Sequence, residues 1–472
     1  MNAWCTDNNG YPVCDEETQR FIGVKPSERQ LAFSEMKYYS FIHFGVNTFT
    51  DREWGDGTED ESIFNPSSLN TDQWCEVLKK TGSKGIILTA KHHDGFCLFN
   101  SKYTEHTVMR SPYGRDIVKE LGVSCKKYGM KLGLYLSPWD RHEKTYGTEA
   151  YNDFFVNQLT ELCTNYGELF CLWFDGACGE GKNGKKQVYD WNRYYSVIRQ
   201  YQPNAVISIS GPDVRWIGNE GGKVRKSEWS VISWTDKSID KNAENSQHNE
   251  NEAEKLQSFD RVEEDLGSRE MLKNKSDLAW SPAEADVSVT KGWFWHDEEY
   301  YKDEENGGVR TPEELAEIYF NTVGGNASML LNVPVNREGL ISDREIKTLG
   351  GFAEIIANTF KLKVQSDICI LSLSGEERPV DTERFMLHND ETGFRIYPHG
   401  KVKTVYLEED IRFSQRVEGF EVYVDGEKVR DCTVIGSGKI IRFPNAQTAE
   451  KIDIIVTQSR SNPVIKKAEI FG

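Results

Sequence analysis

Residues 85–95 read GIILTAKHHDG, and this stretch determines the choice of fold. Its continuous apolar run, without strict alternation, is typical of a strand that is covered on both faces of a parallel sheet. Polar side chains, from Lys91 to Asp94, follow at the point where the apolar run ends. The stretch therefore predicts a buried parallel strand that delivers functional groups at its carboxyl end.

Further stretches of the same character alternate with amphipathic helical patterns. They begin at Tyr39, Lys131, Leu169, Ala205, Trp229, Leu278 and Ala327. One segment between them, TPEELAEIYFNTVGG, offers Thr311 as N-cap, Pro312 at the first helical position and Glu314 to close a capping box. Strands and helices that alternate over roughly 320 residues predict a (β/α)8 barrel, which is an α/β fold.

The pattern changes near Lys361 to short runs with alternating polarity. In GFEVYV, Phe420, Val422 and Val424 share one face, and the following Asp425-Gly426 predicts a hairpin turn. These runs predict a C-terminal antiparallel β-sandwich, which we expect to buttress the barrel rather than to bind carbohydrate.

We therefore divide the chain into three parts: an N-terminal arm over residues 1–24, a (β/α)8-like catalytic domain over 25–360 and the sandwich over 361–472. The stretch 236–277 is polar and rich in Asn and Glu, and we interpret it as a long insertion or loop.

Charge excludes several classes of partner. The chain carries 57 Lys and Arg against 75 Asp and Glu, and its net charge of −18 would repel a phosphate backbone or an anionic membrane. We expect no nucleic-acid partner and, without a run of about 20 apolar residues, no membrane span. The first residues lack the pattern of a signal peptide, so we expect a secreted or periplasmic protein only if such a segment has been removed, and a cytoplasmic one otherwise.

The ten cysteines show no CxxC spacing and several lie in apolar runs, so reduced, buried thiols are expected rather than a disulfide or zinc framework. Cys5 and Cys14, in the polar N-terminal arm, are the two that look free to pair.

Polar residues gather where the predicted strands end. His43 closes the first strand, His92 and His93 the second, and Asp175 the fourth, while Glu220 follows the fifth within GPDVRWIGNEGG. A carboxylate directly after a buried apolar strand is costly unless it is paired or functional. Two carboxylates among histidines and tryptophans at one barrel mouth favour glycoside hydrolysis, with one acid protonating the departing oxygen while the other attacks the sugar or activates water.

Two alternatives remain open at this point. A zinc or two-metal hydrolase could use the same histidines and acids, but adjacent His92 and His93 would point to opposite faces of a regular strand, and no metal-binding motif is present, so no metal and no cofactor is expected. A lectin-like protein could keep the sugar pocket without turnover.

These residues lie in motifs that resemble the α-L-fucosidases of glycoside hydrolase family 29. The similar stretches are FIHFGVNTFTDREWGDGTED, LTAKHHDGFCLF, GLYLSPWDRH, LWFDGACGEG, GPDVRWIGNEGG, PAEADVSVTKGWFWH and LLNVPVNREGLI, in this order over about residues 25–345. More narrowly, WFDGA with RWIGNE resembles the branch that acts on α-1,3/1,4-linked fucose of Lewis-type structures.

The resemblance implies a retaining exo-α-L-fucosidase whose partner is a fucosylated oligosaccharide or glycoprotein glycan. It implies Asp175 as nucleophile and Glu220 as general acid/base, with Glu284 and Glu228 as competitors for the second role. The positions that match fucose-binding residues are His43, Glu53, Trp54, His92, His93, Tyr135 and Trp293. Asp213, Arg215 and Glu284 are the candidates for the side of the leaving group.

Overall fold

A parallel eight-stranded sheet forms the first and larger part of the molecule. The computed structural model describes residues 16–234, 265–380 and 384–472. The strands, in spatial order, are β5 (Val206–Ile209), β4 (Leu169–Phe174), β3 (Lys131–Leu136), β2 (Gly85–Lys91), β1 (Tyr38–Ile42), β10 (Ala327–Asn332), β9 (Ala283–Ser288) and β6 (Arg215–Trp216). A parallel bridge between Ser208 and Val214 connects the two ends of this order and closes the sheet into a barrel.

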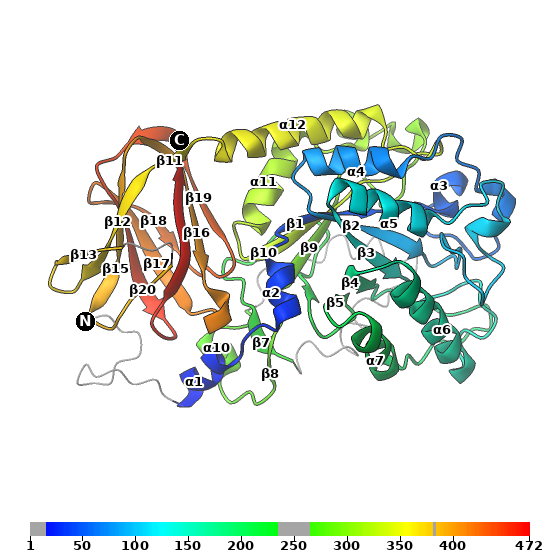
Figure 1. Cartoon of the computed structure of the whole chain (residues 1–472), viewed down its shortest axis with the longest axis horizontal. Helices are drawn as coiled ribbons and strands as arrows, with labels where there is room; N and C mark the ends of the chain where they lie inside the picture. Colours follow the sequence, from blue (N-terminus) through cyan, green and yellow to red (C-terminus); the bar gives the residue numbers. More distant parts are fainter. Residues whose placement is uncertain (1–15, 235–264, 381–383) are drawn as a thin grey trace.

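Helices cover the outside of the barrel (Figure 1). They are α2 (Glu28–Ser34), α4 (Thr71–Lys80), α5 (Ile117–Tyr128), α6 (Glu149–Asn165), α7 (Trp191–Tyr201), α11 (Pro312–Thr322) and α12 (Asp343–Phe360). The other described helical segments are α1 (Glu16–Gly23), α3 (Val46–Thr50), α10 (Arg269–Leu272), η1 (Glu61–Ile63), η2 (Val108–Arg110), η4 (Glu298–Tyr301), η5 (Glu305–Gly308) and η6 (Ile411–Phe413). At the start of α11 the predicted capping box is confirmed, because Thr311 and Glu314 satisfy each other's backbone N–H groups.

One predicted barrel strand is wrong. The run that begins at Trp229 forms β7 (Val231–Ser233), which pairs with β8 (Leu278–Trp280) in a separate antiparallel ribbon. The run that begins at Leu278 is two strands rather than one, since Pro282 lacks the N–H that a continuous ladder needs. The sixth place in the barrel belongs to β6, which is too short to produce an apolar run.

The C-terminal part consists of two antiparallel sheets packed face to face, at the left of Figure 1. One sheet contains β11 (Lys363–Val364), β21 (Val464–Phe471), β16 (Lys401–Glu409) and β19 (Lys439–Thr448), with β14 (Phe385–Met386) beside β21. The other contains β13 (Glu377–Pro379), β12 (Ser366–Ser372), β15 (Glu391–Pro398), β20 (Ile452–Ser459), β17 (Val417–Val424) and β18 (Glu427–Cys432). The predicted hairpin is present, with Asp425 and Gly426 at positive φ between β17 and β18. We retain 360 as the proposed domain boundary.

The sandwich contacts the barrel at the segment that follows β6. The amide of Gln415 accepts a hydrogen bond from the Ser230 N–H at 2.8 Å and donates to the Glu228 carbonyl at 3.2 Å. Asn326, at the start of β10, donates to the same carbonyl at 2.8 Å and accepts from the Ser437 N–H at 2.6 Å. The two domains therefore hold residues 228–230 between them.

Within the described part of the chain, all eight cysteines are unpaired and six of them are buried. Cys5 and Cys14 lie outside the described residues, as does 236–264 of the polar stretch. The described helices include none long and apolar enough to cross a bilayer, and the described His, Cys, Asp and Glu side chains form no group of three arranged to hold a metal ion.

Candidate active site

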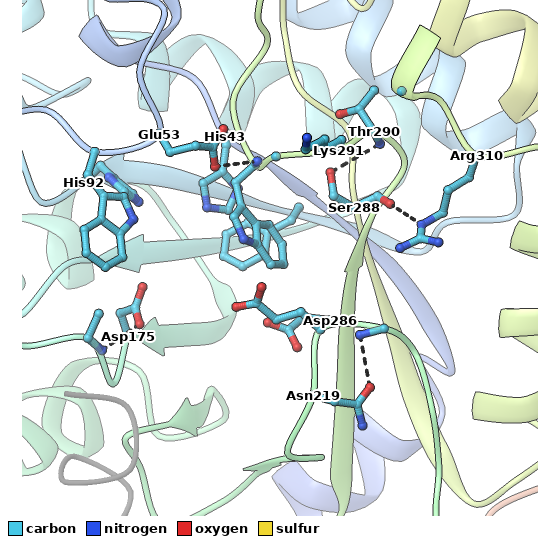
Figure 2. Close-up of a pocket in the computed structure, with 18 of the residues that line it drawn as sticks. His43, Glu53, His92, Asp175, Asn219, Asp286, Ser288, Thr290, Lys291 and Arg310 are labelled. Carbon is cyan, nitrogen blue, oxygen red and sulfur yellow. Dashed lines mark hydrogen bonds between the residues drawn. The ribbon is translucent and has the colours of Figure 1, made fainter. Parts of the chain in front are cut away.

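A cavity of about 1280 Å³ opens at the carboxyl ends of the barrel strands. Its walls include eight of the residues that the sequence singles out: His43, Glu53, Trp54, His92, His93, Asp175, Glu220 and Trp293. Figure 2 shows His43, His92, Asp175 and Glu53 around this space, with Asp286 on the side of β9. The volume exceeds the ~300–1,000 Å³ of typical small-molecule pockets, so there is room for more than one sugar ring.

Asp175 stands directly after β4, where the strand delivers its carboxylate to the cavity. Oδ2 accepts a hydrogen bond from the Tyr135 hydroxyl at 2.9 Å, and Oδ1 accepts one from the Ala177 N–H at 2.9 Å. His93 Nε2 lies 3.7 Å from Oδ2. The two hydrogen bonds therefore fix the carboxylate in one orientation, with His93 beside it. Tyr135 itself is fully buried beneath the cavity and reaches it through Asp175.

Glu220 lies in the loop after β6, and its exposed surface faces into the cavity. Burial within the cavity walls and the negative charges of Asp175 and Glu53 together raise the pKa of its carboxyl to about 7. A hydrogen bond from the Trp293 side chain opposes this rise. The cavity thus contains one carboxylate held by donors and one carboxyl that retains a proton near neutral pH.

The three histidines are neutral in this environment. Burial lowers the pKa of His43 to about 3 and that of His93 to about 4, and it lowers the pKa of His92 well below the usual range. His43 donates through Nδ1 to Asn332 Oδ1 at 2.8 Å, and His93 Nδ1 lies 2.7 Å from Ser137 Oγ. Neutral imidazoles of this kind can exchange hydrogen bonds with sugar hydroxyls without adding charge.

The expectation that His92 and His93 point to opposite faces is wrong. Both line the cavity, with ring centroids 4.1 Å apart. Strand β2 ends at Lys91, so the alternation of a regular strand no longer applies to the two histidines. Lys91 instead points away from the cavity and forms a buried ion pair with Asp140, at 2.8 Å.

A network of backbone and side-chain donors holds Glu53. Its carboxylate accepts hydrogen bonds from the N–H groups of Trp293 at 2.8 Å and Phe294 at 3.2 Å, and from His296 Nε2 at 2.5 Å. His296 Nδ1 lies 3.0 Å from Asp51 Oδ1. The loop with Glu53 and Trp54 is therefore connected to the loop with Trp293.

Besides Tyr135, three predicted residues do not line the cavity. Asp213 is ion-paired with Arg29 at 3.0 Å and with Arg199, and Arg215 is ion-paired with buried Glu228. Glu284 is fully buried behind Trp173, whose indole N–H donates to it at 2.6 Å. Each of the three is thus held by its own partners inside the fold, so the prediction that they contact the leaving group does not fit the structure. Neither Glu284 nor Glu228 is placed to compete with Glu220.

Sequence reasoning missed several residues of the site. Asp286 and Arg310 line the cavity, and His296 supports Glu53. A signal existed for Asp286: in AEADVS, the polar residues at 284, 286 and 288 alternate with apolar ones, which places all three on one face of a barrel strand.

Comparisons with known proteins agree with this geometry. The family profile described as Alpha-L-fucosidase matches residues 26–358. The chain is 37% identical to Alpha-L-fucosidase 1 of Arabidopsis thaliana, covering 94% of this chain and 87% of that protein. A glycoside hydrolase 29 family member from an unknown rumen bacterium is 33% identical, with a TM-score of 0.75 over 95% of this chain and 77% of that one.

A Ruminococcus gnavus GH29 fucosidase, solved in complex with fucose, is 29% identical, with a TM-score of 0.77 over 95% of each chain. The profile match covers most of the barrel, and the similarity to the plant enzyme extends over nearly the whole chain. Together with a cavity built from two carboxyl groups and neutral histidines, these matches show that the chain belongs to the α-L-fucosidase family, glycoside hydrolase family 29.

Proposed function

We propose that this α-L-fucosidase is a retaining exo-enzyme that removes α-1,3/1,4-linked fucose from branched, Lewis-type glycans. One observation carries the catalytic part of the proposal: Asp175 and Glu220 line one cavity, and the charge of the first raises the pKa of the second. A general acid must be protonated when substrate arrives, and the raised pKa of Glu220 suits it to this role.

In the first step, Asp175 attacks the anomeric carbon while Glu220 gives its proton to the glycosidic oxygen, so the leaving sugar departs as an alcohol. In the second step, Glu220 removes a proton from water as the water attacks the fucosyl ester. Fucose leaves with its original anomeric configuration, and both carboxyl groups return to their starting states. His43, Glu53, Trp54, His92, His93 and Trp293 surround the sugar in this proposal, and Tyr135 orients the nucleophile.

The linkage preference is supported by two observations. The motifs WFDGA and RWIGNE resemble the branch with this specificity. The cavity also extends beyond Asp175 and Glu220 to a wall formed by Tyr300, Asn306 and Arg310, which leaves space for the other arms of a branched trisaccharide.

The linkage is tested by product analysis with Lewis a, Lewis x, 2′-fucosyllactose and an aryl fucoside under identical conditions. We expect faster release of fucose from the two Lewis trisaccharides than from the other two, with activated aryl fucosides still hydrolysed at a measurable rate. Equal release from 2′-fucosyllactose would refute the linkage preference but not the mechanism.

The mechanism is tested by two substitutions. Asp175→Ala should abolish turnover. Glu220→Ala should slow substrates with poor leaving groups far more than activated aryl fucosides, and azide should restore part of the activity by replacing water as nucleophile. An equal loss on both kinds of substrate, without rescue by azide, would remove Glu220 from the acid/base role.

A further inference from the structure

A short backbone ladder brings a third carboxyl group next to Glu220. Gly221 forms an antiparallel bridge with Val287 of β9, so Glu220 and Asp286 are the residues immediately before the two bridged positions. Successive side chains alternate between faces, so Glu220 and Asp286 project from the same face of this ladder as diagonal neighbours. Both line the cavity, and Figure 2 shows Asp286 there beside Asn219.

Asp286 is buried without a compensating cation. Asp286 is only 4% exposed, and its Oδ1 accepts a hydrogen bond from Trp216 Nε1 at 2.6 Å. Neither Asp286 nor Glu220 forms an ion pair with any residue that the structure describes. A buried carboxylate without a cation is costly, and two adjacent carboxyl groups cannot both ionise readily.

We propose that Asp286 and Glu220 share one proton, and that Asp286 is a positioning residue that keeps this proton available to the acid/base. The inference rests on the proposed role of Glu220. In the first step the pair loses its proton to the leaving oxygen, and in the second step the attacking water returns one proton to the pair. No other donor or acceptor is required.

The surrounding charges are consistent with this arrangement. Around the pair lie Asp175 after β4, Glu53 after α3, Glu284 on β9, Lys223 in the acid/base loop, Lys291 after β9 and Arg310 before α11. Lys291 is ion-paired with Glu304, at 2.6 Å. Burial and the charge of Glu220 raise the pKa of Asp286 well above the usual range, as expected when two neighbouring carboxyl groups cannot both ionise readily.

The first test is the pH dependence of kcat/KM in Asp286→Asn, measured with a Lewis trisaccharide. An amide of the same shape carries no negative charge, so Glu220 should lose its proton more easily. We expect the basic limb of the pH profile of kcat/KM, where activity falls as Glu220 loses its proton, to move to lower pH by about one unit. Asp367→Asn, which removes the same charge from the distant sandwich, should leave the limb in place. An unmoved limb in Asp286→Asn would overturn the proposal, whatever the level of activity.

A second variant moves the limb in the opposite direction and does not alter either carboxyl group. Trp216→Phe removes the N–H that stabilises charged Asp286. The state in which both carboxyl groups are ionised then becomes less favourable, and a higher pH is needed to form it. We expect the basic limb to move to higher pH. This variant also decides the question if Asp286→Asn does not fold, because an unmoved or downward-moving limb would contradict a shared proton.

Failure of this inference differs from failure of the proposed function. If azide rescues Glu220→Ala while the limb stays fixed in both other variants, the acid/base assignment stands and the shared proton does not. If azide fails to rescue Glu220→Ala and both kinds of substrate lose activity equally, the acid/base role proposed for Glu220 is wrong.

Discussion

The hydroxyl of Tyr135 lies 2.9 Å from Oδ2 of Asp175 and donates to it from beneath the cavity. Tyr135 is fully buried on β3, and Asp175 follows the neighbouring strand β4. Adjacent parallel strands therefore supply the nucleophile and a donor that orients it.

Tyr135→Phe should lower kcat/KM without unfolding the barrel. A hydrogen bond to a charged group contributes about 1.5–3 kcal/mol, so we expect a loss on the order of 10- to 100-fold, measured with a Lewis trisaccharide. Tyr38→Phe is the matched control, since it removes a hydroxyl that bonds Thr81 at 3.0 Å on the side of β1 away from the cavity. An unchanged kcat/KM in Tyr135→Phe would show that this hydroxyl does not support the nucleophile.

Trp293→Phe should raise the pKa of Glu220. The Trp293 side chain stabilises the ionised form of this carboxyl, which has a pKa of about 7, and phenylalanine cannot donate. The basic limb of kcat/KM should therefore begin at higher pH in the variant than in the parent. The pH profile of an aryl fucoside with a good leaving group provides the control, since such a substrate depends little on the acid. A limb that moves to lower pH would contradict the direction of this contact.

His296→Gln should destabilise the protein most at low pH. Glu53 and Asp51 accept hydrogen bonds from this buried ring and raise its pKa against the opposing effect of burial. A raised pKa in the folded state contributes stability that is fully present below the unfolded value, near pH 6.5, and is lost as pH rises through the folded value. Urea unfolding should show a deficit of about 1–3 kcal/mol at pH 6 that shrinks at alkaline pH. A deficit independent of pH would argue against an imidazolium at this position.

Asp140→Ala should destabilise the barrel strongly. Lys91 and Asp140 are both buried, and their ion pair at 2.8 Å leaves Lys91 without a counter-charge when the carboxylate is removed. Loss of one partner of a buried pair costs about 3–5 kcal/mol, which denaturant titration can measure. Glu76→Ala, which breaks an exposed pair with Lys80, should change stability by no more than about 1 kcal/mol. Similar effects of both substitutions would contradict the importance of burial.

The sequence was sufficient for the barrel and for the first half of the site. Strands β1 to β5 are long apolar runs, and the polar residues at their ends, such as His43 and Asp175, are visible because they interrupt such runs. The second half was harder to predict because β6 has two residues and β9 carries three polar side chains in six. β6 is too short to show a periodicity, and β9 alternates in polarity instead of forming the continuous apolar run of β1 to β5.

The misplaced candidates have a common physical cause. Asp213, Arg215 and Glu284 are charged residues near functional motifs, and proximity in sequence suggested a role in binding. Each forms ion pairs or hydrogen bonds with other residues inside the fold. A buried charge needs such partners in the core as much as in an active site, so its presence does not by itself indicate a role in binding. Pairing of this kind depends on contacts far apart in the chain, such as Arg29 with Asp213.

The hydrogen bonds of Gln415 to residues 228–230 connect the sandwich to the segment that follows the Glu220 loop. A shortened protein that stopped after α12 would retain the strand that carries the nucleophile. It would lose the Gln415 contact to the segment just downstream of Glu220. We therefore expect removal of the sandwich to weaken the support of the Glu220 loop before it affects Asp175.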